Sequence, residues 1–343
     1  MKYRILIALV LAMAVLGGCA PATGASGGQQ YTATFLDLFD TVTTIIGRAE
    51  SESAFRETAQ TIHDDLMRYH RLFDIYNDYD GVNNLKTVND NAGIAPVVVD
   101  RTIVELLLQC RSYCDLTGGK VNVAMGSVLQ LWHNARNLGV NDPQNAALPD
   151  MDALQEAADH WDFDCVVIEE DKSTVYITDP AQRLDVGAVA KGWATQKAAE
   201  NAPSGMLISV GGNVCATGPK LSDGTPWVIG IQDPNAADKN LHTVYLPEGC
   251  VVTSGDYQRT YVVDGKRYHH IIDPDTLMPS TYWRSVSIVC SDSGLADALS
   301  TALFLMDKDT GEQLARSCGA EVFWVAADGR EYMTDGFAKM LRT

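Results

Sequence analysis

The feature that most constrains this fold is the segment Leu295–Met306, which is apolar along almost its whole length. Its length and composition predict a helix, and the polar side chains inside that helix are Asp297, Ser300 and Thr301. A helix that is apolar on every side belongs in the interior of a protein, because no face of it suits water. We therefore expect this helix to be wholly buried.

Elsewhere the chain alternates between helix-like and strand-like segments. Apolar residues from Phe55 to Phe73 recur at intervals of three and four, which is typical of an amphipathic helix. Further helices are predicted at 102–116 and 188–200. Short strands are predicted at 165–168, 175–177, 206–210, 227–231, 250–253, 260–263, 285–290, 321–325 and 331–333. Because no repeat period accompanies this mixture, we expect an α+β fold with two intimately packed subdomains that share a cleft.

The first residues are typical of a targeting signal. Lys2 and Arg4 precede the apolar run Ile5–Leu16, which is too short to cross a hydrocarbon core of about 30 Å. The following Gly17-Gly18-Cys19 completes a sequence that resembles the lipobox of bacterial lipoproteins, in which the cysteine is lipidated. The alternative is an ordinary signal peptide with an incidental cysteine.

These features predict a division of the chain and a location. Residues 1–18 are expected to be a lipoprotein signal peptide, residues 19–30 a flexible tether that begins at lipidated Cys19, and residues 31–343 one folded domain. A lipid on Cys19 would anchor the protein on the extracytoplasmic face of the cell membrane.

The net charge of the chain limits the classes of partner that it could bind. With 26 basic and 44 acidic residues, the formal net charge is −18, so most of the surface would repel nucleic acid, and we exclude nucleic-acid binding. Cysteines other than Cys19 lack the spacing of a metal motif, and most of them stand beside Val, Leu or Ile. We therefore expect those cysteines in the core.

Inside the predicted buried helix, Asp297 and Thr301 are four residues apart and so lie on one face. A buried carboxylate is costly unless it is compensated. A carboxylate and a hydroxyl on one face could bind a hard cation. The alternative is that Asp297 forms a buried ion pair while the Thr301 hydroxyl bonds back to its own helix.

A second cluster combines Thr253-Ser254-Gly255-Asp256-Tyr257 with the segment Tyr268–Pro274, which contains His270. Hydroxyls and a carboxylate at the end of a strand suit phosphate oxygens or a metal. His270 could orient a phosphate or move a proton. The alternative is a hairpin about Asp264-Gly265, with a histidine that hydrogen-bonds to the backbone.

A third cluster spans Leu184–Ala194 and contains Asp185 and Lys191. Lys191 lies near the start of a helix, where a cation is unfavourable unless an anion is close, and a phosphate-bearing ligand would supply that anion. Neither a Walker loop nor a dinucleotide fingerprint occurs in the chain. Gly211-Gly212 is therefore expected to mark a close approach of backbones.

Taken together, these segments resemble the ApbE family, the FAD:protein FMN transferases. The motifs are LDVGAVAKGWA at 184–194, SVGGN at 209–213, TSGDY at 253–257, HHIIDP at 269–274 and ADALSTALFLM at 296–306. The resemblance covers the chain from about Thr32 onward. It implies an ApbE-like fold with helices and mixed or antiparallel sheets, and a magnesium-dependent enzyme.

The resemblance also assigns roles to single residues. It implies that Mg²⁺ is held by Asp297, Thr301 and the main-chain carbonyl of Ala188. It implies FAD contacts from Tyr76, Asp185, Lys191 and Ile272, and places Asp256 and His270 as the candidates that polarise a hydroxyl or steady the phosphates. Two positions depart from the family pattern: Phe39 stands where Met is common, and Lys120-Val121-Asn122 replaces a segment that ends in a carboxylate.

The implied reaction moves FMN from FAD to a Thr or Ser hydroxyl of a partner protein and releases AMP. In the family such acceptors are flavoprotein subunits of Rnf- or Nqr-type electron-transport complexes. Because this chain has no clear acceptor motif of its own, we expect the acceptor in trans. Two alternatives stay open, an Mg²⁺-dependent FAD pyrophosphatase that yields FMN and AMP, and a flavin-binding lipoprotein without turnover.

Overall fold

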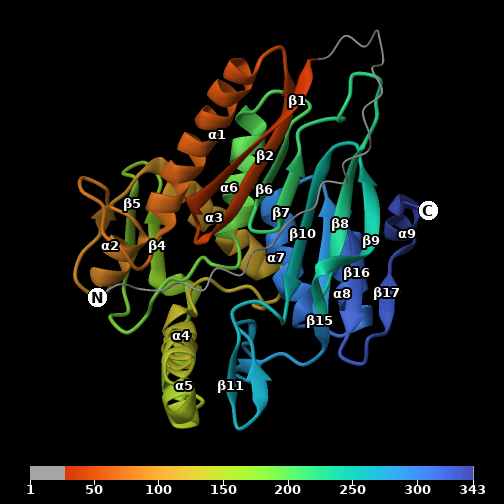
Figure 1. Ribbon diagram of the computed structural model, residues 1–343. Coiled ribbons are helices and arrows are strands. Elements are labelled where there is room, and N and C mark those ends of the chain that lie inside the picture. Colours follow the sequence, from red (N-terminus) through yellow and green to blue (C-terminus); the bar gives the residue numbers. More distant parts are fainter. Residues whose placement is uncertain (1–27, 343) are drawn as a thin grey trace.

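The computed structural model describes residues 28–342, so the expected signal peptide, Cys19 and most of the expected tether lie outside the described residues. A twisted antiparallel sheet of eight strands runs through the centre of the molecule (Figure 1). In spatial order its strands are β1 (Gln29–Leu38), β2 (Thr41–Ala49), β6 (Leu207–Val210), β7 (Asn213–Ala216), β10 (Gly249–Gly255), β15 (Trp283–Cys290), β16 (Glu321–Ala326) and β17 (Glu331–Met333).

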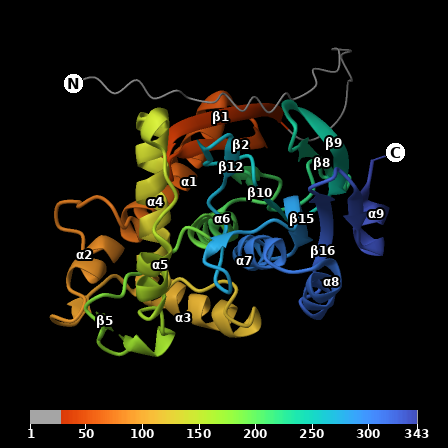
Figure 2. The same cartoon turned by 90° about the horizontal axis from the view of Figure 1, so that it is seen from below.

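The two faces of this sheet are covered differently, because side chains alternate along each strand. Ile45, Ile208 and Ile288 point into the main core. This face carries four helices, α1 (Glu52–Phe73), α6 (Ala190–Asn201), α7 (Ser293–Phe304) and α8 (Lys308–Ser317). Val251 and Phe323 point to the opposite face. There they pack against the hairpin of β8 (Trp227–Asp233) and β9 (Ala236–Leu246) and against α9 (Asp335–Met340) (Figure 2).

Residues 74–186 form the second part of the fold. Its helices are α2 (Leu85–Asp90), α3 (Arg101–Leu116), α4 (Gly126–Asn141) and α5 (Met151–Ala158), with short 3-10 helices at Pro143–Asn145 and Phe163–Cys165. Its small antiparallel sheet has the order β3 (Val97–Val98), β5 (Thr174–Ile177) and β4 (Val166–Glu169). Apolar residues of this part and of the main sheet belong to one continuous core, so the two parts are intimately packed.

A separate small core joins α4 and α5 to two small hairpins near the bottom of Figure 1. Trp132 of α4 donates a hydrogen bond to the carbonyl of Leu277 at 2.9 Å. In these hairpins β11 (Tyr261–Val263) pairs with β12 (Lys266–Tyr268), and β13 (Ile272–Asp273) pairs with β14 (Met278–Pro279), apart from the eight-stranded sheet. This arrangement brings α4 close to β11, although more than a hundred residues separate them in the chain.

The α+β expectation is confirmed, and the segment that became α7 is buried along almost its whole length. Some elements were not predicted: the β1–β2 hairpin, α4, α5, α8, α9 and β9. The hairpin about Asp264-Gly265 that we considered as an alternative is present, because β11 pairs with β12 there. The expected tether was wrong at its end, because Gln29 and Gln30 already pair with Ala49 and Arg48 in the sheet. Among the described residues, no helix has the length and apolar character needed to cross a membrane.

The predicted helix at 188–200 begins later than expected, at Ala190. The backbone N–H groups of Val189 and Ala190 both donate to the carbonyl of Val186, which forms a tight turn before the helix. All seven cysteines in the described part are free, and Cys110, Cys215 and Cys250 lie in the core as expected.

Candidate active site

A cavity of about 420 Å³ lies between the α6–α7 pair, the α4 helix and the loops at the ends of the central strands. This volume is within the usual range for small-molecule sites. Every predicted site residue except Asp256 lines it, namely Phe39, Tyr76, Lys120, Val121, Asn122, Asp185, Ala188, Lys191, His270, Ile272, Asp297 and Thr301. The tertiary structure therefore gathers segments that are far apart in the sequence.

Asp297 is the most buried carboxylate of the cavity, with 4% of its surface exposed. Its Oδ2 atom accepts a hydrogen bond from the backbone N–H of Gly192 at 2.8 Å and lies 3.6 Å from Nζ of Lys191. A charge-assisted hydrogen bond and an ion pair are what a buried carboxylate requires. The other oxygen, Oδ1, has neither kind of contact within residues 28–342, which leaves it available to the cavity.

The pairing also explains the position of Lys191 at the start of α6. A cation is unfavourable there unless an anion is near, and Asp297 supplies that anion. The ion pair that we considered as an alternative is therefore present. It occupies one oxygen of the carboxylate, so it does not conflict with a cation site at the other.

Gly192 permits this contact between α6 and α7. A Cβ atom at Gly192 would lie 2.3 Å from the carbonyl oxygen of Ser293 and 2.4 Å from Cβ of Asp297. Real Cβ atoms do not approach so closely, so any side chain at Gly192 would force the two helices apart. The lysine–glycine pair at 191–192 thus places the ammonium and the backbone donor together on Asp297.

Two more oxygen atoms face the cavity beside Asp297. In a regular helix the N–H of Gly192 would bond to the carbonyl of Ala188, but it is diverted to Asp297, and the Ala188 carbonyl has no other donor in the described part of the chain. The Thr301 hydroxyl also lacks a hydrogen-bond partner there. Ser300, not Thr301, bonds back to the carbonyl of Asp297, at 2.9 Å.

These donors fit a magnesium ion by their chemistry. A carboxylate, a hydroxyl and a main-chain carbonyl are all hard oxygen ligands. The described residues contain no group of three or more His, Cys, Asp or Glu side chains that could hold a metal ion. An ion here would complete its ligands with water and substrate oxygens, as Mg²⁺ does when it binds phosphates.

The two adjacent histidines differ in their surroundings. His269 donates from Nε2 to the carbonyl of Ser280 at 2.8 Å and accepts from the N–H of Ile271, so it is the histidine satisfied by backbone. His270 lines the cavity, where its ring is accessible but enclosed by protein. That burial, followed by the positive charge of Arg259, lowers the pKa of His270 to about 3. His270 is therefore a neutral base at physiological pH.

Asp256 does not reach the cavity. Its Oδ2 accepts a hydrogen bond from Nε of Arg284 at 2.6 Å and lies 3.5 Å from Arg267. Its backbone N–H donates to the carbonyl of Arg284. These contacts anchor the turn whose next residues, Gln258 and Arg259, line the cavity. In this geometry Asp256 is a positioning residue for the turn rather than a group beside the phosphates.

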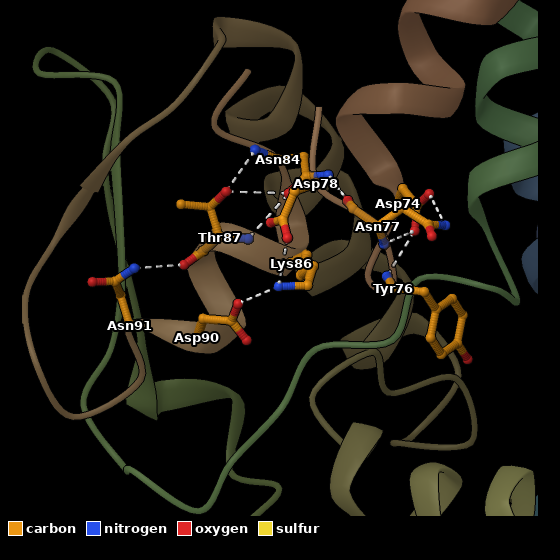
Figure 3. Close-up of polar contacts among 9 residues, drawn as sticks. All are labelled: Asp74, Tyr76, Asn77, Asp78, Asn84, Lys86, Thr87, Asp90 and Asn91. Atoms are coloured by element: carbon orange, nitrogen blue, oxygen red, sulfur yellow. Dashed lines mark hydrogen bonds and ion pairs between the residues drawn. The ribbon is translucent and has the colours of Figure 1, made fainter. Parts of the chain in front are cut away.

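Tyr76 is presented to the cavity by the loop that follows α1 (Figure 3). Asp74 accepts hydrogen bonds from the backbone N–H groups of Tyr76 and Asn77, at 2.7 and 3.0 Å, and from the side chain of Asn77. In Figure 3 the Tyr76 ring points away from this network. Lys86 of α2 pairs with Asp78 of this loop and with Asp90 of its own helix, so an ion pair ties the loop to α2.

Phe39 lies in the two-residue turn between β1 and β2, with a φ of 52°. A residue other than glycine is strained in this region, and such strain is common near functional sites. The N–H of Phe39 donates to Nδ1 of His70 at 3.1 Å, which holds the turn against α1. The neighbouring turn contains Gly211, where a Cβ would lie 2.7 Å from Oγ1 of Thr41, and the Gly211 N–H donates to the carbonyl of Val42 at 3.1 Å. The close backbone approach that we predicted is therefore present at Gly211, whereas a Cβ at Gly212 would meet nothing within 4 Å.

The segment that departs from the family pattern forms another part of the lining. Lys120 bonds through Nζ to Asp273 and Asp275, both at 2.8 Å. Burial by itself would lower the pKa of Lys120, but these hydrogen bonds outweigh it and raise that pKa. Asn122 accepts from the N–H of Ala124 and donates to the carbonyl of Trp161. A carboxylate could not make the second bond, so Asn122 has a structural use of its own.

The lining residues that the sequence analysis did not predict include His133 and Arg136 on α4, Arg259, and Asn213. Asn213 is 2% exposed, and its Nδ2 has no hydrogen-bond partner among the described residues. Its place after Gly211-Gly212, at the start of β7, was a usable signal. For α4 the available signal was the spacing of His133 and Arg136, which lie three residues apart and so share a helix face.

Comparison with known proteins agrees with this geometry. The model of the ApbE family matches residues 36–324. The chain is 36% identical to an FAD:protein FMN transferase from Treponema pallidum (strain Nichols), over 75% of each chain. It is 27% identical to one from Klebsiella pneumoniae (strain 342), over 95% of this chain and 93% of that protein.

Solved structures extend the likeness to the fold. The ApbE protein from Thermotoga maritima superposes with a TM-score of 0.80 and 30% identity, over 92% of this chain and all of that one. The flavin transferase ApbE from Vibrio cholerae, 23% identical, shares the fold with a TM-score of 0.75, over 91% of this chain and 99% of that one. The motifs around one cavity, the matched family model and these relatives together show that this chain belongs to the ApbE family, whose matched members are FAD:protein FMN transferases.

Proposed function

We propose that this chain is a magnesium-dependent FAD:protein FMN transferase, which moves FMN from FAD to a Thr or Ser hydroxyl of a partner flavoprotein and releases AMP. The observation that carries the proposal is the cavity wall formed by α6 and α7. There Oδ1 of Asp297, the Thr301 hydroxyl and the Ala188 carbonyl face one space without protein partners in the described residues. The names of the matched relatives support the same reaction.

The proposed mechanism gives each residue a task. When bound to Asp297, Thr301 and Ala188, Mg²⁺ would supply positive charge to the diphosphate. Lys191 binds a phosphate oxygen while it remains paired with Asp297. A neutral ring nitrogen of His270 takes the proton of the acceptor hydroxyl. The hydroxyl oxygen forms a bond to the FMN phosphorus, and the bond from that phosphorus to the AMP oxygen breaks, so AMP leaves with the electron pair.

The location and the partner are part of the proposal. A lipid on Cys19 would hold the enzyme at the extracytoplasmic face of the membrane, which the signal-like residues 1–18 support. The acceptor would be a flavoprotein subunit in trans, of the Rnf or Nqr type that the family resemblance implies.

The reaction is tested with purified protein, FAD, Mg²⁺ and a candidate acceptor subunit. We expect covalent flavin on the acceptor, seen as fluorescence of the denatured protein band, with one AMP released for each FMN transferred. A chelator should abolish both signals. The matched control is the acceptor with its target Thr replaced by Ala. Free FMN with AMP in place of labelled acceptor would indicate a pyrophosphatase, and intact FAD would indicate a binding protein.

A further inference from the structure

A second polar group lines the cavity, separate from the α6–α7 wall. It consists of Arg136 and His133 on α4 and of Arg259 in the turn before β11, and we call it the arginine wall. Helix α4 packs against β11, since Trp132 of α4 and Tyr261 of β11 belong to the same small core. The two elements are neighbours in Figure 1. A Cβ atom at Gly139 of α4 would lie only 2.7 Å from the ring of Tyr261, which shows how closely the two elements pack.

Among the residues that the structure describes, the arginines of this wall have no hydrogen bond or ion pair with a carboxylate. Elsewhere in the described residues basic side chains near the cavity are paired, as Arg284 is with Asp256 and Lys120 is with Asp273. Arg136 donates to Nδ1 of His133, at 3.2 Å, and to Oδ1 of Asn137, at 3.5 Å, which are both neutral acceptors. Arg259 has no hydrogen bond or ion pair within residues 28–342. Unpaired guanidinium groups are notable in a chain with a net charge of −18.

The two guanidinium groups also act on one another. Burial, followed by the positive charge of Arg259, lowers the pKa of Arg136, and the carboxylate of Asp185 offsets this only in part. Oδ1 of Asp185 itself accepts a hydrogen bond from the backbone N–H of Gly187 at 2.8 Å. Two like charges on one cavity wall are unfavourable without an anion between them. The proximity of these two positive charges therefore has an electrostatic cost that an anionic ligand would reduce.

The wall is held in place before any ligand arrives. The ring of His133 stacks on that of Tyr76, with centroids 5.0 Å apart and planes 24° apart. Arg259 has a φ of 47°, a left-handed conformation that is strained for a residue other than glycine. The contacts of Asp256 with Arg284 anchor the turn that imposes this conformation. Strain that is maintained by neighbouring contacts is typical of a site that needs its side chain in one place.

The chemistry of two planar guanidinium forks selects an oxyanion with several oxygens, and phosphate suits them best. We propose that Arg136 and Arg259 form an oxyanion subsite for the phosphoryl group of adenylate, in the same cavity as Asp297 and Thr301 but on other elements. This inference rests on the proposed function, in which that group begins as half of a diphosphate and leaves as AMP. AMP carries a phosphate monoester dianion, whereas each phosphoryl group of FAD carries one charge. The subsite should therefore bind released AMP more tightly than the same group within FAD.

The proposal is tested by calorimetric binding of AMP, adenosine and FAD to the full chain, with a chelator present so that no metal contributes. The variants are Arg136→Gln, Arg259→Gln and their combination. Each single change should weaken AMP binding about tenfold, because a charge-assisted hydrogen bond is lost, while adenosine binding stays unchanged. Raising the salt from about 50 to about 300 mM should weaken AMP binding to the native chain but not to the double variant.

Two controls separate this role from a structural one. Arg316→Gln on α8 removes an exposed arginine that pairs with Glu312 and does not line the cavity, and it should leave AMP binding unchanged. Arg136→Lys keeps the charge but removes the planar fork, and it should restore part of the affinity. Thermal unfolding of each variant checks that the fold is retained.

Three outcomes would overturn the subsite. Unchanged AMP affinity in the double variant would show that the arginines do not touch the phosphate. An equal loss of adenosine affinity would indicate a structural role. Equal losses for FAD and AMP would contradict the preference for AMP. Because these assays need no turnover, they fail independently of the FMN-transfer assay.

Discussion

The α6–α7 wall and the arginine wall face the same cavity but are stabilised in opposite ways. In the α6–α7 wall, Asp297 is buried and paired with Lys191 and the Gly192 N–H. In the arginine wall, the charges of Arg136 and Arg259 lack carboxylate partners in the described part of the chain. In the first wall, protein groups balance the charge of Asp297 and leave other oxygen atoms available to a cation. In the second wall, an anionic ligand would be needed to balance the positive charges. A cation site and an anion site thus require opposite arrangements of the same kinds of charge.

The largest effect should follow from breaking the α6–α7 wall at its carboxylate. Asp297→Asn removes the charge that Lys191 and the proposed Mg²⁺ would share, while it keeps the shape of the side chain. We expect FMN transfer to fall by about 1,000-fold, as for the loss of a main electrostatic contact in an active site. The rate of AMP release at saturating FAD, measured over a range of Mg²⁺ concentrations, is the direct readout.

The matched control is Asp256→Asn, since Asp256 is a half-buried aspartate that contacts Arg284 instead of lining the cavity. It should lower thermal stability and reduce activity much less than Asp297→Asn does. Equal losses of kcat for the two variants would contradict the assignment of the metal ligands to α7.

A smaller effect should come from His270, which is influenced by both walls. Arg259 and Arg136 belong to the arginine wall and Lys191 to the α6–α7 wall, and after burial these charges, with His269, lower the pKa of His270 to about 3. His270→Asn should therefore reduce kcat about 100-fold, as for the loss of a general base. In the native enzyme, kcat/KM should not fall through a titration at the usual histidine pKa of 6.5, because that ratio reports the free enzyme.

Substrate should then move the titration of His270. A bound diphosphate would offset the positive charges of Arg259 and Lys191, so the acid limb of kcat should lie at higher pH than that of kcat/KM. Without ligand, the unfolded chain binds a proton at His270 between pH 6.5 and about 3 that the folded chain does not. This group therefore makes the free energy of unfolding rise with pH across that window. Coincident acid limbs would contradict the influence of the two walls.

The smallest effects concern packing, and they compare one glycine from each wall. Gly192→Ala forces a Cβ against the backbone of Ser293 and should destabilise the fold by about 1–3 kcal/mol, as for overpacking of a core. Gly139→Ala meets the ring of Tyr261, which can shift, and alanine favours the helix. We expect a net change of about 1 kcal/mol or less for Gly139→Ala. Chemical denaturation of both variants measures the difference.

Equal destabilisation by the two alanines would contradict the view that the backbone beside Gly192 cannot shift whereas the Tyr261 ring beside Gly139 can. A further readout sharpens the comparison, because Gly192→Ala should also weaken Mg²⁺-dependent turnover by displacing Asp297. Gly139→Ala should leave the metal dependence unchanged, since α4 supplies no proposed metal ligand.

The α6–α7 wall was predictable from the sequence because its chemistry is local. The spacing of Asp297 and Thr301 places both on one helix face, and an apolar helix is buried in any fold. The stripe from Phe55 to Phe73 likewise identified α1, since its 3.6-residue period needs no knowledge of the rest of the chain. Periodicity and composition are properties of contiguous residues, so they can be recognised in the sequence without tertiary information.

The arginine wall could be recognised only from the tertiary structure. Arg136 and Arg259 line the same cavity because α4 packs against β11, and no local sequence pattern indicates that such distant segments are neighbours. The same holds for Asp256, whose motif predicted a place beside the phosphates. The partner that removes it from the cavity, Arg284, lies on a different strand. Charges act through space, so which of them are paired and which are left for a ligand follows from the packing of distant elements.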